Sequence, residues 1–291
     1  KMSKSKGNVM SPQKIINQYG ADILRLWVAS TDYSGELNIS DEIMKRVADS
    51  YRRIRNTLRF LISNIEDIDN ETQLVSPEKM LSIDRFALHQ CQNLQESIIK
   101  DYDAFNFYLG IQKFVSFCSE DLGGFYLDVI KDRLYTMQEN SHGRRSAQSA
   151  LFHITQSLIR IMTPILSFTA HEASETIFKN NKKSIFTETW YQFPKNLLQD
   201  KDLNDWKNVL EIRSFVNKKI EELREKGIVG STLQSVIQIS APEEIHNSLK
   251  VFNDDLKFIF IASKVTIKKN EKLEVNVNKS EHQKCERCWH Y

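Results

Sequence analysis

Residues 40–65 of the chain read SDEIMKRVADSYRRIRNTLRFLISNI, and this stretch decides the fold class. Ser40 suits the cap of a helix, and Asp41 and Glu42 fall in its first turn, where the helix dipole favours acids. Apolar side chains then follow every three or four residues, at Ile43, Val47, Tyr51, Ile54, Leu58, Leu61 and Ile65. The spacing predicts one long amphipathic helix whose apolar stripe faces a core.

Helical spacing continues on both sides of this stretch. A short helix is predicted between Ser11 and Gly20, and a second one begins near Asp22. Four more runs have helical character: residues 87–98, 108–122, 125–135 and 144–178. The glycine pair at 123–124 permits a break or bend, and Pro164 should kink or interrupt the last run. Together these runs predict a helical bundle.

The hydrophobic period changes in the last third of the chain. A polar, irregular stretch at 180–205 is typical of a linker, and a helix that contains Trp206 ends near Gly227. Three alternating runs then predict strands: residues 233–239, 259–267 and 273–277. We therefore predict a mainly α protein in which a helical bundle is followed by a small α/β module.

Composition excludes several classes of protein. A length of 291 residues suggests about two domains, and 41% hydrophobic residues are enough to build cores, which excludes disorder throughout. No run of about 18 apolar residues occurs, so no membrane span is expected, and no signal peptide is visible. The net charge of +2 neither supports nor excludes nucleic acid as a partner. Four cysteines in so long a chain fit a reducing compartment such as the cytoplasm.

The first candidate site is the basic loop at the start of the chain. Lys1 and Lys4 can act as point charges on phosphates, while Ser3 and Ser5 add hydroxyls. Gly7 allows a close approach of the backbone. A loop of this kind can close on a polyphosphate and stabilise the charge that develops on leaving pyrophosphate, which would make both lysines catalytic. Taken alone, the five residues fit a solvated basic segment equally well.

The second candidate is the cysteine pair near the end of the chain. Cys285 and Cys288 have the spacing of a knuckle that binds one side of a tetrahedral zinc ion. A structural site needs four ligands, and His290 is too close to Cys288 for the usual finger spacing. An inert pair and a redox pair are the alternatives. Cys91 and Cys118 lie in apolar stripes and are predicted to be core thiols.

The third candidate is the basic side of the first long helix. Lys45, Arg52 and Arg59 recur every seven residues, so they lie on one side of a helix. Arg55 adds charge nearby. Cations on a rigid helix can follow the phosphates of a nucleic acid, although a solvated helix surface would show the same spacing. Aromatic residues that could stack on unpaired bases, or equally lie in a core or interface, are Trp190, Tyr191, Trp206 and Trp289.

Several stretches, in order along the chain, resemble the class I aminoacyl-tRNA synthetases. The start, KMSKSKGNV at 1–9, is similar to their signature loop, and YGADILRLWVAS at 19–30 is similar to their aliphatic subgroup of isoleucine, valine, leucine and methionine enzymes. Further stretches resemble the bacterial-type isoleucine branch: TDYSGELNIS at 31–40, RNTLRFL at 55–61, YLD at 126–128, KDRLY at 131–135, TPILSFTA at 163–170, IVGSTL at 228–233 and CERCWH at 285–290. The resemblance covers essentially the whole chain and is weak over 240–280.

This resemblance implies a function for each part. It implies that ATP, bound with magnesium, meets Lys4 together with Ser3, Ser5 and Gly7, and that the helical bundle docks tRNA(Ile). It also implies zinc in the cysteine knuckle, completed by a second cysteine pair beyond residue 291. The expected domains are the end of a catalytic domain at 1–39, an anticodon-binding bundle at 40–199, an α/β module at 200–280 and half of a knuckle at 281–291.

Two departures from the family pattern limit what the chain is expected to do. His171 and Glu172 stand where the family usually has two consecutive acids, which we interpret as variation on a helix surface. The seven histidines include no His-x-Gly-His motif, which belongs to the nucleotide-binding half of such enzymes. We therefore expect a C-terminal fragment, cut at both ends and lacking the editing domain, that does not aminoacylate by itself and is a cytoplasmic monomer.

Three other interpretations remain open from the sequence. The chain could be the corresponding part of a valyl, leucyl or methionyl enzyme, which the stretch at 32–35 and the terminal CERCWH argue against. It could be a separate, non-catalytic tRNA-binding module. It could also be a helical scaffold with no RNA role, which strong salt-dependent tRNA binding would exclude.

Overall fold

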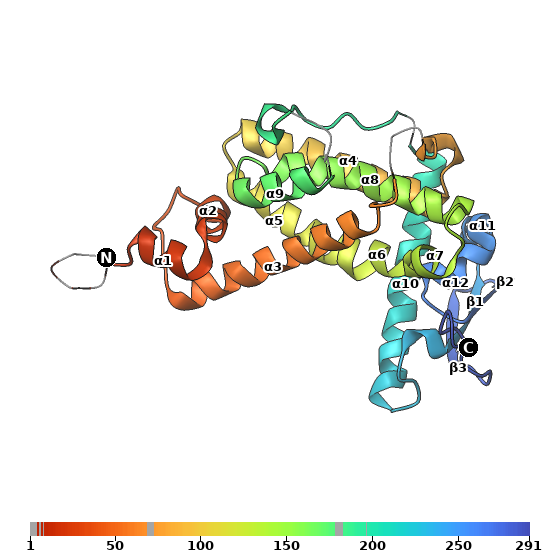
Figure 1. Ribbon diagram of the computed structural model, residues 1–291. Helices are drawn as coiled ribbons and strands as arrows, with labels where there is room; N and C mark the ends of the chain where they lie inside the picture. Colours follow the sequence, from red (N-terminus) through yellow and green to blue (C-terminus); the bar gives the residue numbers. More distant parts are fainter. Residues whose placement is uncertain (1–4, 6, 8, 69–72, 178–182, 196) are drawn as a thin grey trace. The chain divides into compact units, whose positions relative to one another are not determined.

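The computed structural model describes residues 5, 7, 9–68, 73–177, 183–195 and 197–291 (Figure 1). The predicted phosphate-loop residues Lys1, Ser3 and Lys4 lie outside the described residues. The chain forms two compact units, each assembled from three separate stretches of sequence. The first unit comprises Lys1–Val75, Ala87–Phe125 and Gln148–Pro194, and the second comprises Ser76–Phe86, Tyr126–Ala147 and Lys195–Tyr291.

The first unit is helical. It contains α1 (Pro12–Tyr19), α2 (Ala21–Ser30), α3 (Asp41–Ser63), α5 (Phe107–Ser116) and α9 (Ser167–Ile177), and most of α4 (Ser82–Asp103) and α8 (His142–Met162). The predicted starts of α1 and α3 are confirmed, because the Ser11 and Ser40 side chains accept hydrogen bonds from backbone N–H groups in their first turns. Gly20, at φ 93°, joins α1 to α2 in a conformation that favours glycine.

The core of this unit follows the second half of the predicted stripe of α3, where Ile54, Leu58 and Leu61 are buried. At the start of the helix the predicted Ile43 is only half-buried, and its neighbour Met44, which was not predicted, is fully buried instead. Helix α3 packs against α2, α5 and α9. Met44 also joins Ile15 of α1 and Ile23 of α2 in one apolar cluster. The two short helices that follow the start of the chain are therefore packed onto the bundle helix by ordinary apolar burial.

The predicted interruption at Pro164 is confirmed, since α8 ends at Met162 and α9 begins at Ser167. Of the two outcomes predicted for the glycine pair 123–124, a break or a bend, the structure shows no break. A π-helical segment, η4 (Phe117–Tyr126), continues through both glycines. A β-carbon on Gly123 would lie 3.0 Å from the Cys118 carbonyl oxygen, so glycine here permits a wide helical turn instead of ending one.

The second unit joins helices to a small sheet (Figure 1). The strands β1 (Ser235–Ala241), β2 (Lys264–Lys269) and β3 (Glu274–Lys279) have the order β2-β1-β3, with β1 parallel to β2 and antiparallel to β3. Ile237, opposite Val265 and Val277, is buried on the central strand. Helix α10 (Asp200–Glu225) packs against β3, and α11 (Glu243–Phe252) packs against β2. Two short helices, α6 (Leu127–Val129) and α7 (Lys131–Thr136), also belong to this unit.

Three details of the second unit differ from the prediction. The run at 259–267 is only partly strand, because α12 (Leu256–Ile259) is helical, Ile261 has φ 51°, and β2 begins at Lys264. Ile259, Phe260 and Ala262 are all buried, and the sequence there is uniformly apolar, so it does not show where the helix ends and the strand begins. Helix α10 begins at residue 200, inside the predicted linker, where Gln199 and Asp202 form a capping box. The sequence interpretation had no helix at the position of α11.

The predicted fold class is confirmed: the described chain is mainly α and ends in a small α/β module. The compact units are discontinuous in sequence, so the domain limits 1–39, 40–199, 200–280 and 281–291 stay a prediction. Over the described ranges, none of the helices combines the length and apolar character needed to cross a membrane.

Candidate nucleic-acid interface

The start of the chain is described at two of the five predicted phosphate-loop residues. Ser5 and Gly7 are both exposed. Gly7 has φ 64°, a conformation that favours glycine, and a β-carbon there would meet nothing within 4 Å. The open, left-handed backbone fits the predicted close approach to a phosphate, and the roles of these residues stay a prediction.

The predicted basic side of α3 lies in solvent. Lys45, Arg52, Arg55 and Arg59 are all exposed. Arg52 pairs with Asp49 at 2.8 Å on the same helix, whereas Lys45 and Arg59 have no hydrogen bond or ion pair within the described part of the chain. Seven residues advance an α-helix by almost two whole turns, about 20° short, so Lys45, Arg52 and Arg59 form one flank. This row of cations is hereafter the basic flank.

The basic flank borders α9. Arg55 of α3 pairs with Glu172 of α9, with Nη2 and Oε1 3.5 Å apart. One turn earlier, the Tyr51 hydroxyl lies 2.9 Å from the Thr169 hydroxyl. His171, which departs from the family pattern, lies on the exposed side of α9 and not in the core. Helix α9 therefore adds its outward-facing side chains to the surface that the basic flank begins.

A buried carboxylate joins α2 to the start of α9. Asp22 accepts hydrogen bonds from the Thr169 backbone N–H at 2.8 Å, the Thr169 hydroxyl at 2.6 Å and the Phe168 N–H at 3.3 Å. Asp22 thus caps the N-terminus of α9 from a distant part of the sequence. Arg25 donates to the carbonyl oxygens of residues 164–165, at 2.7 and 2.8 Å. Two of the stretches that carry the resemblance, at 19–30 and 163–170, are therefore bonded to each other.

The four aromatic residues considered for base stacking have different surroundings. Trp206 is 1% exposed and stacks on Phe86 at 4.5 Å between ring centroids, so it is a core residue and cannot stack on a base. Trp190 is half-buried against Tyr102, and Tyr191 lies 2.5 Å from His153 Nδ1 through its hydroxyl. Only Trp289 of the four is mostly exposed.

The cysteine pair lies in a closed turn. The Cys285 N–H donates to the His290 carbonyl at 2.8 Å, and the Trp289 N–H donates to the Cys285 carbonyl at 2.9 Å. Hydrogen bonds from the backbone N–H groups of Cys288 and Arg287 lower the pKa of the Cys285 thiol. A thiol in this environment is well prepared to act as a thiolate ligand.

The same turn does not provide a complete metal site. His290 is engaged elsewhere, because its Nε2 lies 2.6 Å from an Asp132 carboxylate oxygen on α7. Across the residues that the structure describes, no three His, Cys, Asp or Glu side chains are grouped so that they could hold a metal. The pair thus offers two of the four ligands of a structural zinc site. Cys91 and Cys118 are buried, as predicted for core thiols, and burial raises the pKa of Cys91 to about 12.

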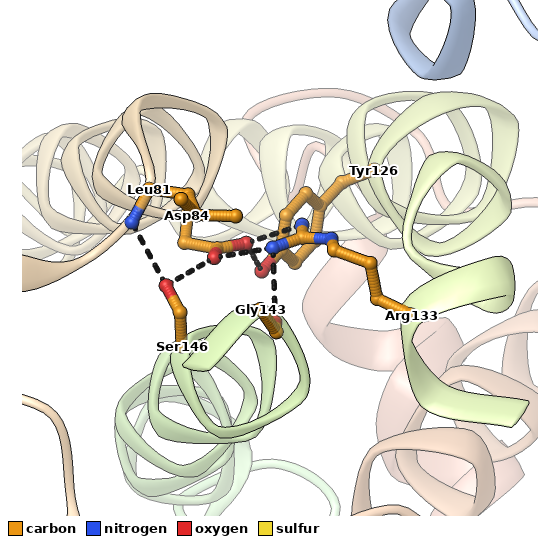
Figure 2. A network of polar contacts seen from close by, with 6 residues as sticks. All are labelled: Leu81, Asp84, Tyr126, Arg133, Gly143 and Ser146. Atoms are coloured by element: carbon orange, nitrogen blue, oxygen red, sulfur yellow. Dashed lines mark hydrogen bonds and ion pairs between the residues drawn. The ribbon is translucent and has the colours of Figure 1, made fainter. Parts of the chain in front are cut away.

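A buried polar network in the second unit was not foreseen from the sequence (Figure 2). Arg133 of the KDRLY stretch donates to both oxygens of the Asp84 carboxylate, each at 2.7 Å. The Tyr126 hydroxyl at 2.8 Å and the Ser146 hydroxyl at 2.5 Å also donate to Asp84, and the Gly143 carbonyl accepts a bond from Arg133 at 3.2 Å. All four oxygen lone-pair directions of the carboxylate are therefore in use.

Electrostatics explains why this ion pair tolerates burial. Burial disfavours the charge on Arg133, but the Asp84 carboxylate more than compensates and holds the pKa of Arg133 above its ordinary value. Burial and the negative charge of Asp84 raise the pKa of Tyr126, so its hydroxyl stays a donor. The local sequence carries no signal for this pair, because residues 127–134 read LDVIKDRL and Arg133 stands there among other charged residues.

Comparison with known proteins assigns the fold to a family. Residues 84–240 match the family described as the anticodon-binding domain of tRNA ligase, and residues 1–40 match class I tRNA synthetases for I, L, M and V. The chain therefore belongs to the anticodon-binding domain family of tRNA ligases, and the resemblance inferred from its motifs is confirmed.

Individual relatives show which tRNA ligases the chain is similar to. The chain is 49% identical over 296 residues to the isoleucine–tRNA ligase of Cupriavidus pinatubonensis and 50% identical over 297 residues to that of Janthinobacterium sp. (strain Marseille). Both matches cover 100% of the chain and 31% of the relative, so the chain spans about a third of the length of these curated relatives.

A solved structure shares the fold. It is the ternary complex of the Agrobacterium radiobacter K84 agnB2 LeuRS with tRNA and LeuAMS, and it matches 97% of this chain and 26% of its own with a TM-score of 0.51. At 14% sequence identity this likeness concerns the fold alone.

Proposed function

We propose that the chain is the tRNA-binding portion of an isoleucine–tRNA ligase, which activates isoleucine with ATP and transfers it to tRNA(Ile). The observation that carries the proposal is the anticodon-binding family match over residues 84–240, together with the isoleucine–tRNA ligases that match the whole chain. The exposed basic flank of α3 supports the same role, because exposed cations on a rigid helix attract phosphates.

The start of the chain is proposed to serve the chemistry of the complete enzyme. Lys1 and Lys4 stabilise the negative charge of the departing pyrophosphate, while Ser3, Ser5 and Gly7 contact the phosphates of magnesium-bound ATP. The class I family match over residues 1–40 supports this role. The chain by itself is not expected to charge tRNA, since it has no His-x-Gly-His motif for the other half of the ATP site. We further propose that it is a monomer of the cytoplasm.

The cysteine turn is proposed to be half of a structural zinc site. Cys285 and Cys288 supply two thiolates, and the lowered pKa of Cys285 favours metal binding at neutral pH. Two further ligands must come from elsewhere, since His290 is held by Asp132. Equilibrium dialysis of the chain against zinc should therefore show weak binding that Cys285→Ser abolishes. Tight binding, retained when His290 is replaced by Gln, would contradict a two-ligand half-site.

The function is tested by measuring the binding of the chain to tRNA(Ile) and to the same tRNA with a changed anticodon, over a series of salt concentrations. We expect a preference for the natural anticodon of about tenfold or more, which corresponds to about 1.4 kcal/mol. We also expect affinity to fall steeply as salt rises, because cations on the protein displace counterions. Absence of binding even at low salt would contradict the proposal.

A further inference from the structure

We propose that the exposed side of α9, the short 3₁₀ turn η5 (Ile185–Thr187) and the basic flank of α3 form one surface that stacks unpaired bases of an RNA loop. Phe168 and Phe186 are the stacking platforms. The inference rests on the proposed tRNA-binding function and identifies the residues that carry it. This surface is hereafter the α9 face.

Two phenylalanine side chains on the α9 face are exposed. Phe168 is 67% exposed and Phe186 is 55% exposed, although burying each ring away from water would be favourable. The His171 ring lies against Phe186, with ring centroids 6.1 Å apart and planes 28° from parallel. Flat side chains that present a free π-face are the usual partners of unstacked bases in single-stranded RNA.

The backbone that carries each ring is already fixed. The Phe168 N–H is bonded to the buried Asp22 carboxylate, in the first turn of α9. Phe186 lies in η5, where its N–H donates to the Ser184 hydroxyl at 3.4 Å and its neighbour Ile185 is buried as an anchor. Binding a base therefore requires no ordering of the backbone, which removes one of the main entropic costs of recognition.

Charge is arranged so that an RNA strand would have a definite orientation. The basic flank offers its cations to phosphates, and Arg55 connects the flank to α9 through its contact with Glu172. On α9 itself, Glu172 and Glu175 are exposed. Glu172 contacts Arg55, and Oε1 of Glu175 lies 3.5 Å from His171 Nε2, which leaves further lone pairs on both carboxylates. Carboxylates repel phosphates but accept hydrogen bonds from base amino groups, as from the cytosine N4 amine. Phosphates are thus expected over α3, with base edges and rings over α9.

This arrangement favours RNA over a protein partner. A protein interface usually has an apolar, charge-depleted centre, whereas α9 also exposes His171, Glu172 and Glu175, and Arg55 of α3 contacts Glu172. Isolated aromatics next to a row of cations are typical of single-strand binding surfaces.

The test uses the 291-residue chain, a tRNA(Ile) transcript and two sets of variants, each with its own control. Phe168→Leu and Phe186→Leu remove the π-face and keep an apolar side chain, and Phe215→Leu on α10 of the second unit is their control because Phe215 is also exposed. Arg59→Gln removes one charge from the basic flank, and Arg53→Gln is its control, since Arg53 is turned toward α5. Circular dichroism checks that every variant is folded.

The salt series should distinguish the loss of a stacking ring from the loss of a charge. Each Phe variant on the α9 face should raise Kd about tenfold and leave the salt dependence unchanged, because stacking releases no counterions. Arg59→Gln should lower the slope of log K against log salt by about one, and both controls should stay near the wild-type values. Replacing an anticodon-loop base by 2-aminopurine should give a fluorescence change on binding that Phe186→Leu reduces.

The failure of this inference differs from the failure of the proposed function. If the wild-type chain binds no tRNA, the proposed function itself is contradicted. If it binds tRNA but both Phe variants stay within about twofold of wild type, the α9 face does not stack bases, and a protein partner for its exposed rings would then be sought.

Discussion

Replacing Asp84 with asparagine should strongly destabilise the second unit, because this carboxylate is the centre of its buried polar network (Figure 2). The Asp84 side chain is 0% exposed and that of Arg133 is 5% exposed. Four hydrogen bonds converge on the two carboxylate oxygens, two from Arg133 and one each from Tyr126 and Ser146. Asparagine has the same shape, so the substitution removes charge and an acceptor without leaving a cavity.

The expected magnitude follows from what remains unpaired. One oxygen becomes an NH₂ group, so two of the four donors lose their acceptor, and each buried donor left unsatisfied costs about 1–3 kcal/mol. Arg133 keeps the Gly143 carbonyl but loses the carboxylate that is hydrogen-bonded to it, and is left as a buried charge that the more distant Asp255 compensates in part. Breaking a buried ion pair by removing one partner costs about 3–5 kcal/mol, so we expect the free energy of unfolding to fall by about 4 kcal/mol.

Urea unfolding followed by circular dichroism measures this loss, and peptide-level hydrogen exchange over α7 locates it. Glu221→Gln is the control, because it removes an exposed ion pair with Arg224 on α10 and should cost no more than about 0.5 kcal/mol. Adding Arg133→Met to Asp84→Asn should recover part of the stability by removing the uncompensated charge. If Asp84→Asn costs no more than the control, or if the double variant is worse, the reasoning is refuted.

Three further predictions concern other buried or reactive groups. Asp22→Ala should remove the cap of α9, lower the free energy of unfolding by about 1–2 kcal/mol and speed hydrogen exchange in the first turn of α9. Asp32→Ala is the control: it affects only an exposed local turn and should leave that exchange unchanged. Burial lowers the pKa of His153 to about 4, so only the unfolded chain is protonated between about pH 6.5 and 4. The free energy of unfolding should therefore fall by at most about 3 kcal/mol as pH drops through that window. His153→Gln should remove this part of the pH dependence, which is measured from urea unfolding midpoints at each pH. Identical pH profiles for the variant and the wild type would contradict the prediction. Cys285 should react with a disulfide reagent at neutral pH, whereas Cys91 should react only in denaturant. Hydrogen bonds lower the pKa of the Cys285 thiol, and burial raises the pKa of the Cys91 thiol to about 12. Equal reaction rates for the two thiols in the folded chain would count against this assignment.

Local sequence patterns predicted the elements that local physics controls. The stripe of α3, its Ser40 cap and the interruption at Pro164 depend on residues within a few positions of one another, and all three are confirmed. The errors occur where a local pattern admits two structures. Glycine at 123 permits a π-helical turn as readily as a break, and the apolar run at 258–262 suits a buried helix end as well as a strand.

A site could be predicted from the sequence when its residues all lie on one helix. The basic flank follows from a seven-residue repeat on a single helix, so the sequence was enough to locate it. The Asp22 and Asp84 contacts join residues that are 147 and 49 positions apart, and no local pattern encodes such pairs. The exposed rings at 168 and 186 were missed for a related reason, because exposure depends on the packing of the whole unit.

The two buried carboxylates show why a family motif need not mark a site of chemistry. Asp22 lies in a stretch that carries the resemblance to the class I synthetases, and Asp84 accepts from the arginine of another such stretch. Each carboxylate is stable in its core only when donors from distant segments are all in place, since an unpaired buried charge costs several kcal/mol. Each therefore selects one mutual arrangement of those segments. In the first unit, that arrangement sets the start of α9 and so fixes the backbone of Phe168 in its first turn. The Asp22 contact thus has no chemistry of its own, yet it determines which side chains of α9 the unit exposes.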